Sequence, residues 1–264
     1  MPPKTKTLSD VDAARSAAIL GRPLTLPCGV TLPNRLVKAA MSELLADTRN
    51  RATAAHQTLY GAWAKDGPGL MLTGNVQIDR QHMEHAGNVA IQGKQNADQL
   101  TALRAWSTAA KREGSQIWMQ LAHAGRQTQR WVNDTPKAPS AVPLDLPGIK
   151  FGTPIALTQK EIVDLIERFG YAASVARETG FDGVELHAAH GYLFSQFLSP
   201  RSNVREDEWV VPASCWRWSG PSEQRSASIS QLPSNSTPQI SSEAASASRI
   251  ARSSPAGSTR RVSI

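Results

Sequence analysis

The stretch TQKEIVDLIERFGYAASVARETGFDGVELHAA, residues 158–189, decides the fold class because a helix and a strand follow each other in it. Thr158, with Glu161 three residues later, is a capping box and starts a helix. The apolar residues that follow share one helical face: Ile162, Leu165, Ile166, Phe169, Ala173 and Ala176. Thr179 and Gly180 end the helix, and the apolar run 181–189 predicts a buried strand.

The same alternation recurs towards the N-terminus. Buried strands are predicted at 36–41, 69–77 and 116–123, and helices at 55–67 and from 96 to 113. Residues 20–35 predict a hairpin because Gly, Pro and Asn break their short apolar runs. A long loop (124–157) and a turn of helix at 191–198 complete the pattern. Strands alternating with helices indicate a parallel sheet, which a doubly wound fold and part of a (β/α)₈ barrel satisfy equally.

The two ends of the chain depart from this pattern. Residues 1–18 are polar and are predicted to be flexible. Residues 210–264 contain 16 serines and too few apolar residues to build a core, so we predict that they are disordered. They are either a natural low-complexity tail or an out-of-frame or mis-spliced reading. The predicted units are therefore 1–18, 19–209 and 210–264.

Charge and composition narrow the class of protein. The net charge is +7, of which residues 210–264 contribute +4 through six Arg and two Glu. These arginines are scattered, with no interleaved aromatic residues beyond Trp216 and Trp218, which argues against nucleic-acid binding. No apolar run reaches about 18 residues, and no apolar segment follows MPPKTKTLSD, so neither a membrane span nor a secretory signal is expected. Cys28 and Cys215 are expected to be free thiols of a cytoplasmic protein.

Four segments in order carry a resemblance to a known family. They are LPNRLVKAAMSE (32–43), GLMLTGNV (69–76), WMQLAHAGRQ (118–127) and GFDGVELHAAHGYLFSQFLSPRSNVREDE (180–208). They resemble the first four barrel strands of the old yellow enzymes, which are FMN-dependent ene-reductases. The resemblance implies the N-terminal half of a TIM barrel with FMN at the C-terminal ends of the strands. It also implies hydride transfer from NAD(P)H, through the flavin, to the C=C bond of an α,β-unsaturated carbonyl compound.

The family's catalytic residues match three positions in the last of these segments. The resemblance makes His187 and His190 the donors to the substrate carbonyl oxygen, where negative charge builds as hydride arrives. It makes Tyr192 the acid that protonates the α-carbon. Outside this context the two histidines would read as packed side chains or as part of a metal site. No third ligand is close in sequence, although His123 exists, and no metal is expected.

The resemblance also assigns the cofactor contacts. Gln120 would hydrogen-bond the pyrimidine edge of FMN, since its amide offers a donor and an acceptor. Ser42 takes the place of a Thr or Cys near the flavin O4 and N5 atoms. Backbone contacts would come from Ala40 and Met41, His187 would also border the flavin, and Gly74 would let the ring approach closely.

The resemblance stops at residue 209. Strands five to eight and the residues that hold the FMN phosphate have no counterpart in the sequence after that point. Two alternatives to an active enzyme therefore stay open: a truncated, catalytically inactive family remnant, and a half-barrel that pairs with another chain. We expect a small enone as the binding partner, and neither a nucleic acid nor a membrane. Whether the chain forms a homo-oligomer stays open.

Overall fold

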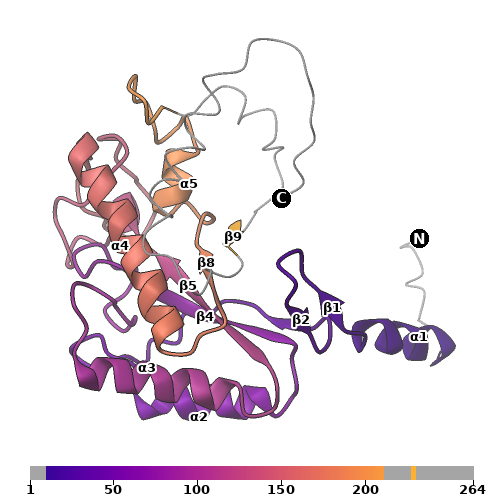
Figure 1. Cartoon of the computed structure of the whole chain (residues 1–264). Coiled ribbons are helices and arrows are strands. Elements are labelled where there is room, and N and C mark those ends of the chain that lie inside the picture. The colour runs from indigo at the N-terminus through magenta and orange to yellow at the C-terminus, as the bar shows by residue number, and fades with distance from the viewer. Residues whose placement is uncertain (1–9, 211–226, 230–264) are drawn as a thin grey trace, which may run out of the picture.

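The computed structural model describes residues 10–210 and 227–229, and its centre is a twisted parallel sheet (Figure 1). The strands β3 (Val37–Lys38), β4 (Leu70–Gln77), β5 (Gln116–Ala122) and β8 (Gly183–Leu186) lie side by side in that order. Every neighbouring pair is parallel. A doubly wound sheet reverses its strand order, whereas a barrel keeps chain order. The prediction of a partial (β/α)₈ barrel is therefore confirmed, with four of its parallel strands described.

Helices connect these strands and cover the outer face of the sheet (Figure 1). They are α2 (Ala54–Ala64), α3 (Ala97–Ala110) and α4 (Gln159–Glu178). The start signals act as predicted: Asn96 accepts a hydrogen bond from the Gln99 N–H at 2.9 Å, and Thr158 accepts one from the Glu161 N–H. Fully buried aromatic and aliphatic side chains from α2, α3, α4 and the strands form one hydrophobic core.

Smaller elements close the ends of the half-barrel. The predicted hairpin consists of β1 (Leu24–Thr25) and β2 (Thr31–Leu32), and Leu32 packs against Leu70 and Trp118 on the inner side of the sheet. The long loop contains the 3₁₀ turn η1 (Gly125–Gln127) and a parallel pair, β6 (Lys137–Ala138) with β7 (Ile155–Ala156). The predicted turn of helix is α5 (Leu193–Phe197).

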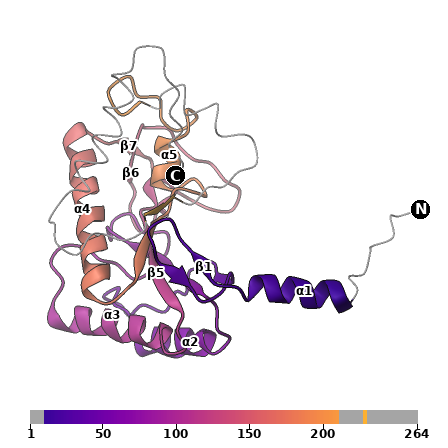
Figure 2. The ribbon, with the colours of Figure 1, turned by 45° about the vertical axis from the view of Figure 1, so that its right-hand side comes forward.

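Three segments differ from expectation. A helix, α1 (Asp10–Leu20), forms within the stretch expected to be flexible and projects away from the sheet in both views (Figures 1 and 2). A strand forms within the predicted range 36–41, but its predicted burial and length were wrong, because β3 has two residues and Val37 is 50% exposed at the edge of the sheet. In the C-terminal segment, β9 (Ala227–Ile229) pairs antiparallel with β8. The rest of the predicted tail lies outside the described residues.

The inner face of the sheet is built in layers that run across the strands. Leu72, Trp118 and Gly183 are in register, and a Cβ on Gly183 would lie 2.9 Å from the Trp118 ring. One layer up, Asn75 and Glu185 flank Gln120 in register. Barrel interiors are normally filled by such layers of branched apolar side chains. Here the lower layer is apolar and the upper one is polar.

Candidate active site

The polar layer lies towards the C-terminal ends of β4, β5 and β8. Asn75, Gln120 and Glu185 are all nearly inaccessible to solvent, and the Gln120 Nε2 donates a hydrogen bond to the Glu185 Oε1 at 2.6 Å. Burial raises the pKa of Glu185, and the hydrogen bond from Gln120 opposes that effect. The Asn75 Oδ1 and both polar side-chain atoms of Gln77 are buried without a partner among the described residues. Such atoms are rare and point to a missing partner with complementary polar groups.

Directly above this layer, the chain leaves β8 and brings three predicted catalytic residues together. The His187 ring lies 5.1 Å from the His190 ring and 4.9 Å from the Tyr192 ring, measured between centroids. Both pairs are edge-to-face, with interplanar angles of 89° and 73°. His190 has a left-handed backbone (φ 56°), which is uncommon outside glycine, and Gly191 follows at φ 75°. This turn folds His190 back beside His187.

His187 is held as a neutral hydrogen-bond donor. Its Nδ1 accepts a hydrogen bond from the Ala189 N–H at 3.3 Å, so in the neutral ring the proton is on Nε2. Burial, with a smaller contribution from the charge of His190, lowers the pKa of His187 to about 4. Near pH 7 the ring is therefore uncharged, and among the described residues its Nε2–H has no acceptor and can donate to a ligand.

A carboxylate that was not predicted lies between the other predicted residues. Glu84, on the loop after β4, accepts hydrogen bonds from the Ser42 Oγ at 3.0 Å and from the Asn75 Nδ2. Burial raises the pKa of Tyr192, and the negative charge of Glu84 and its hydrogen bond with the phenol raise it further. Glu84 therefore links Ser42 and Tyr192, which the sequence places 150 residues apart.

The remaining predicted contacts lie on the segment after β3. Met41 is 53% exposed, and Ala40 is partly buried. A Cβ on Gly74 would lie 2.4 Å from the Met41 carbonyl oxygen and 2.3 Å from the Glu43 carboxylate. The Gly74 N–H also donates to that carboxylate at 2.8 Å. The close approach that requires a glycine here is thus made by residues 41–43 of the chain itself.

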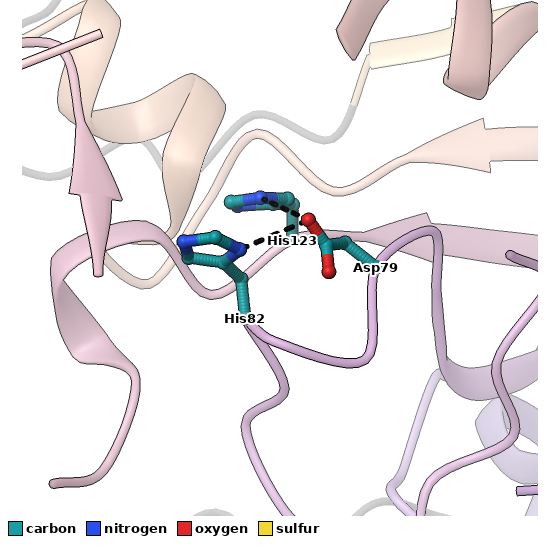
Figure 3. Close-up of side chains that lie close together, drawn as sticks. All are labelled: Asp79, His82 and His123. Atoms are coloured by element: carbon teal, nitrogen blue, oxygen red, sulfur yellow. Dashed lines mark hydrogen bonds and ion pairs between the residues drawn. The ribbon is translucent and has the colours of Figure 1, made fainter. Parts of the chain in front are cut away.

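A second cluster of titratable groups, formed by Asp79, His82 and His123, has metal-ligand spacing (Figure 3). The hydrogen bonds argue against coordination. The Lys137 N–H donates to the His82 Nε2, and the Gly125 N–H donates to the His123 Nδ1. Both neutral rings therefore carry their proton on the nitrogen that faces the carboxylate, where a metal would need a lone pair. Burial also lowers the pKa of His123 and keeps that ring neutral.

This cluster instead holds a buried carboxylate in place. The His82 Nδ1–H donates to the Asp79 Oδ2 at 3.0 Å, and the Arg168 Nη1 does so at 3.3 Å. Burial alone would raise the pKa of Asp79, but the hydrogen bond from His82, the electrostatic interaction with His82 and His123 and the hydrogen bond from the Gln81 N–H bring it down to about 2. The cluster thereby ties the loop that carries Glu84 to α4 and β5.

Two other features lie away from these groups. Arg126 donates to the carbonyl oxygens of Val142 and Pro143 and so fixes the long loop. An open hollow of about 730 Å³ lies between residues 91–95 and α4, where Lys94 and Tyr171 line it. None of the residues predicted for the site lines this hollow.

Sequence reasoning missed three polar residues of this region. Asn75 and Glu185 interrupt apolar strands, and a polar residue within such a strand is a signal of a functional position. Glu84 stands in an irregular polar loop between β4 and α3, where no pattern distinguishes it from its neighbours.

Comparison with known proteins agrees with the barrel. The sequence profile of the NADH:flavin oxidoreductase / NADH oxidase family matches residues 20–252, a range that extends beyond residue 209, where the resemblance was expected to stop. The chain belongs to this family. Within the described residues, no helix is long and apolar enough to cross a membrane.

Individual relatives match most of this chain but only part of their own length. The NADH-dependent flavin oxidoreductase iliE of Neonectria sp. (strain DH2) is 39% identical over 204 residues, which are 72% of this chain and 27% of that protein. The NADH-dependent flavin oxidoreductase iccE of Talaromyces variabilis is 37% identical over 205 residues, 72% of this chain and 50% of that protein. The crystal structure of the old yellow enzyme homologue from Zymomonas mobilis aligns with a TM-score of 0.64 at 28% identity, over 72% of this chain and 54% of that one. The chain thus spans half or less of the curated relatives described here.

Proposed function

We propose that this chain carries the catalytic face of an FMN-dependent oxidoreductase that transfers hydride from NAD(P)H to the C=C bond of an α,β-unsaturated carbonyl compound. The observation that carries the proposal is the neutral His187. Its Nδ1 accepts a hydrogen bond from the Ala189 N–H, and its Nε2–H has no acceptor among the described residues. The ring centroids of His190 and Tyr192 lie 5.1 and 4.9 Å from that of His187.

The residues present fit the ring of a flavin. The Gln120 amide, the unpartnered Asn75 Oδ1 and the unpartnered Gln77 side chain supply the donors and acceptors that the polar edge of an isoalloxazine requires. Ser42 and the backbone of residues 40–41 would border the ring from the end of β3. When bound, the flavin supplies the hydride chemistry that no amino-acid side chain can supply.

The side chains of this chain would then act on the substrate. The N–H groups of His187 and His190 bind the carbonyl oxygen, and they stabilise the enolate more than the ground state because negative charge builds on that oxygen. A neutral His187 suits this role, since near pH 7 its Nε2–H donates without the ring having to bind or release a proton. Tyr192 keeps its proton over a wide pH range because its pKa is raised, and it donates that proton to the α-carbon.

A second candidate is a chain of the same family without catalytic activity. It is favoured by β9, which pairs antiparallel with the edge of β8 where a barrel would place its next parallel strand. An antiparallel strand at that edge competes with closure of the barrel.

One experiment separates the two candidates. The full chain is purified in the presence of FMN, freed of unbound flavin, and assayed for a flavin absorbance band and for enone-dependent oxidation of NADPH and NADH. The proposal predicts a yellow protein whose turnover falls by about 10²–10³-fold in His187→Ala, the loss typical for one oxyanion donor. His190→Asn keeps an N–H donor and is the matched control, expected to lose far less than His190→Ala. A chain that retains no flavin, or that retains it and reduces no enone, would favour the inactive candidate.

A further inference from the structure

Glu84 is held by side chains that converge on it from three parts of the chain. Its Oε2 accepts hydrogen bonds from the Ser42 Oγ at 3.0 Å, from the Asn75 Nδ2 and from the Asn88 Nδ2 at 3.4 Å. The phenol of Tyr192 is close enough for the negative charge of Glu84 to raise its pKa. These donors come from the ends of β3 and β4, the loop after β4 and the loop after β8.

The chemistry of this donor set is that of an anion site. All four groups are neutral: Ser42, Asn75 and Asn88 donate to the carboxylate, and Tyr192 brings a further O–H close to it. Neutral donors that converge on an anion give charge-assisted hydrogen bonds, which are roughly twice as strong as those between neutral groups. Such a site would therefore bind a small oxyanion through hydrogen bonds alone, and the bound carboxylate would keep its negative charge.

Glu84 can leave this site without unfolding its loop. The base of the loop is fixed by the bond between His82 and Asp79 and by Asn88, whose Nδ2 donates to the Asn75 carbonyl oxygen at 3.0 Å. Glu84 itself is only partly buried and is joined to this frame by three side-chain torsions. Rotation about them would remove the carboxylate and leave the four donors facing an open position.

We propose that Ser42, Asn75, Asn88 and Tyr192 form a carboxylate-binding site that Glu84 fills in the free chain, and that an external small molecule bearing a carboxylate occupies it when Glu84 swings out. Glu84 is then an internal competitor for that ligand. The inference shares Ser42, Asn75 and Tyr192 with the function proposed above, but it does not rest on that function because it requires no flavin. It also has a consequence for that function: the hydroxyl of Tyr192 faces a substrate only after Glu84 has left.

The test is rescue by an added carboxylate. Glu84→Ala opens the site, and its thermal midpoint is measured with sodium acetate or benzoate against sodium chloride at equal ionic strength. The expected result is a rise in the midpoint with carboxylate that is at least twice the rise in the wild-type chain. Calorimetric titration with benzoate should give an affinity at least ten-fold above that of the wild type. Glu206→Ala, which removes an exposed glutamate elsewhere, is the matched control and should behave as the wild type does.

Further variants assign the effect to this site. Removing the donors in Glu84→Ala/Ser42→Ala/Tyr192→Phe should abolish the carboxylate effect. If Glu84→Ala fails to fold, Glu84→Asp decides, because its shorter side chain cannot reach Ser42 and Asn75 together and should also bind acetate. Equal carboxylate binding by the wild type and the folded variant, or undiminished binding after loss of the donors, would overturn the proposal. Since no flavin or NAD(P)H is present, a failure here is separate from a failure of the enzymatic assay.

Discussion

Asp79 offers a direct test of the view that the Asp79–His82–His123 cluster holds the site loop and binds no metal. Asp79→Asn keeps the shape of the side chain and removes its charge. In the folded protein the hydrogen bond from His82, the electrostatic interaction with His82 and His123 and the hydrogen bond from the Gln81 N–H outweigh burial and lower the pKa of Asp79 from 3.8 to about 2. Each pKa unit corresponds to about 1.4 kcal/mol, so the ionised carboxylate contributes about 2 kcal/mol to the free energy of unfolding at pH 7. Asp79 is 6% exposed, and solvent screens this contribution little.

The sign of the pH dependence follows from the lowered pKa. Below its unfolded pKa the carboxylate binds a proton more readily in the unfolded chain than in the folded one, so stability falls as the pH drops. The contribution is fully present above about pH 5 and is lost as the pH falls through about 2. The difference in unfolding free energy between the wild type and Asp79→Asn should therefore shrink from about 2 kcal/mol at pH 7 to about half of that at pH 3.

Chemical denaturation at the two pH values measures this difference. Asp164→Asn is the matched control, because Asp164 pairs with the same arginine, Arg168, at 2.7 Å but has a half-exposed side chain. An exposed pair of this kind is worth about 0.2–1 kcal/mol. The reasoning is refuted if both variants lose the same stability, or if the loss in Asp79→Asn does not change between pH 7 and pH 3.

Three further predictions concern packing, the polar layer and metal binding. Gly183→Ala should lower the free energy of unfolding by about 1–3 kcal/mol, measured with denaturant, because the added Cβ would meet the Trp118 ring. Gly170→Ala is the control and should gain stability, since a Cβ there would meet nothing within 4 Å. Equal effects of the two variants would contradict the layer packing. Glu185→Gln should unfold at a higher denaturant concentration than the wild type at pH 8, and this gain in stability should be smaller at pH 4. Burial raises the pKa of Glu185, so the stability that the protonated carboxyl contributes is lost as the pH rises. A gain in stability that is the same at both pH values would count against this. EDTA should leave the thermal midpoint unchanged and added zinc should not raise it; a zinc-dependent rise that His82→Ala abolishes would revive the metal interpretation.

Much of the barrel could be predicted because its signals are local. The capping residues Asn96 and Thr158 satisfy backbone N–H groups within one turn, so their effect is visible over four residues of sequence. The apolar runs of β4 and β5 are buried on both faces, which gives a continuous signal. The apolar run around β3 predicts burial in the same way. However, β3 lies at the edge of the sheet, where a strand is covered on fewer sides, and Val37 is exposed.

The residues of the candidate site could be predicted from the sequence where they belong to one short motif. His187, His190 and Tyr192 lie within six residues of one another, so one turn of the chain brings them together. Glu84 is different, because its partners Ser42 and Tyr192 are 42 and 108 residues away and its own surroundings in the sequence are polar. A contact of this kind depends on how loops from three strand ends pack, and no periodicity encodes that.

The polar layer shows how one irregularity determines what the site can do. Between Leu72 and Asn75, β4 advances three residues while β5 advances two, from Trp118 to Gln120. A strand alternates its side chains, so without this bulge Asn75 would face the helices on the outer side and Gly74 would face inward. The bulge turns Asn75 towards Gln120 and Glu84, and Gly74 leaves room on the strand for residues 41–43. The same bulge thereby brings Ser42 next to the polar layer, and a side chain at position 74 would be expected to separate the two.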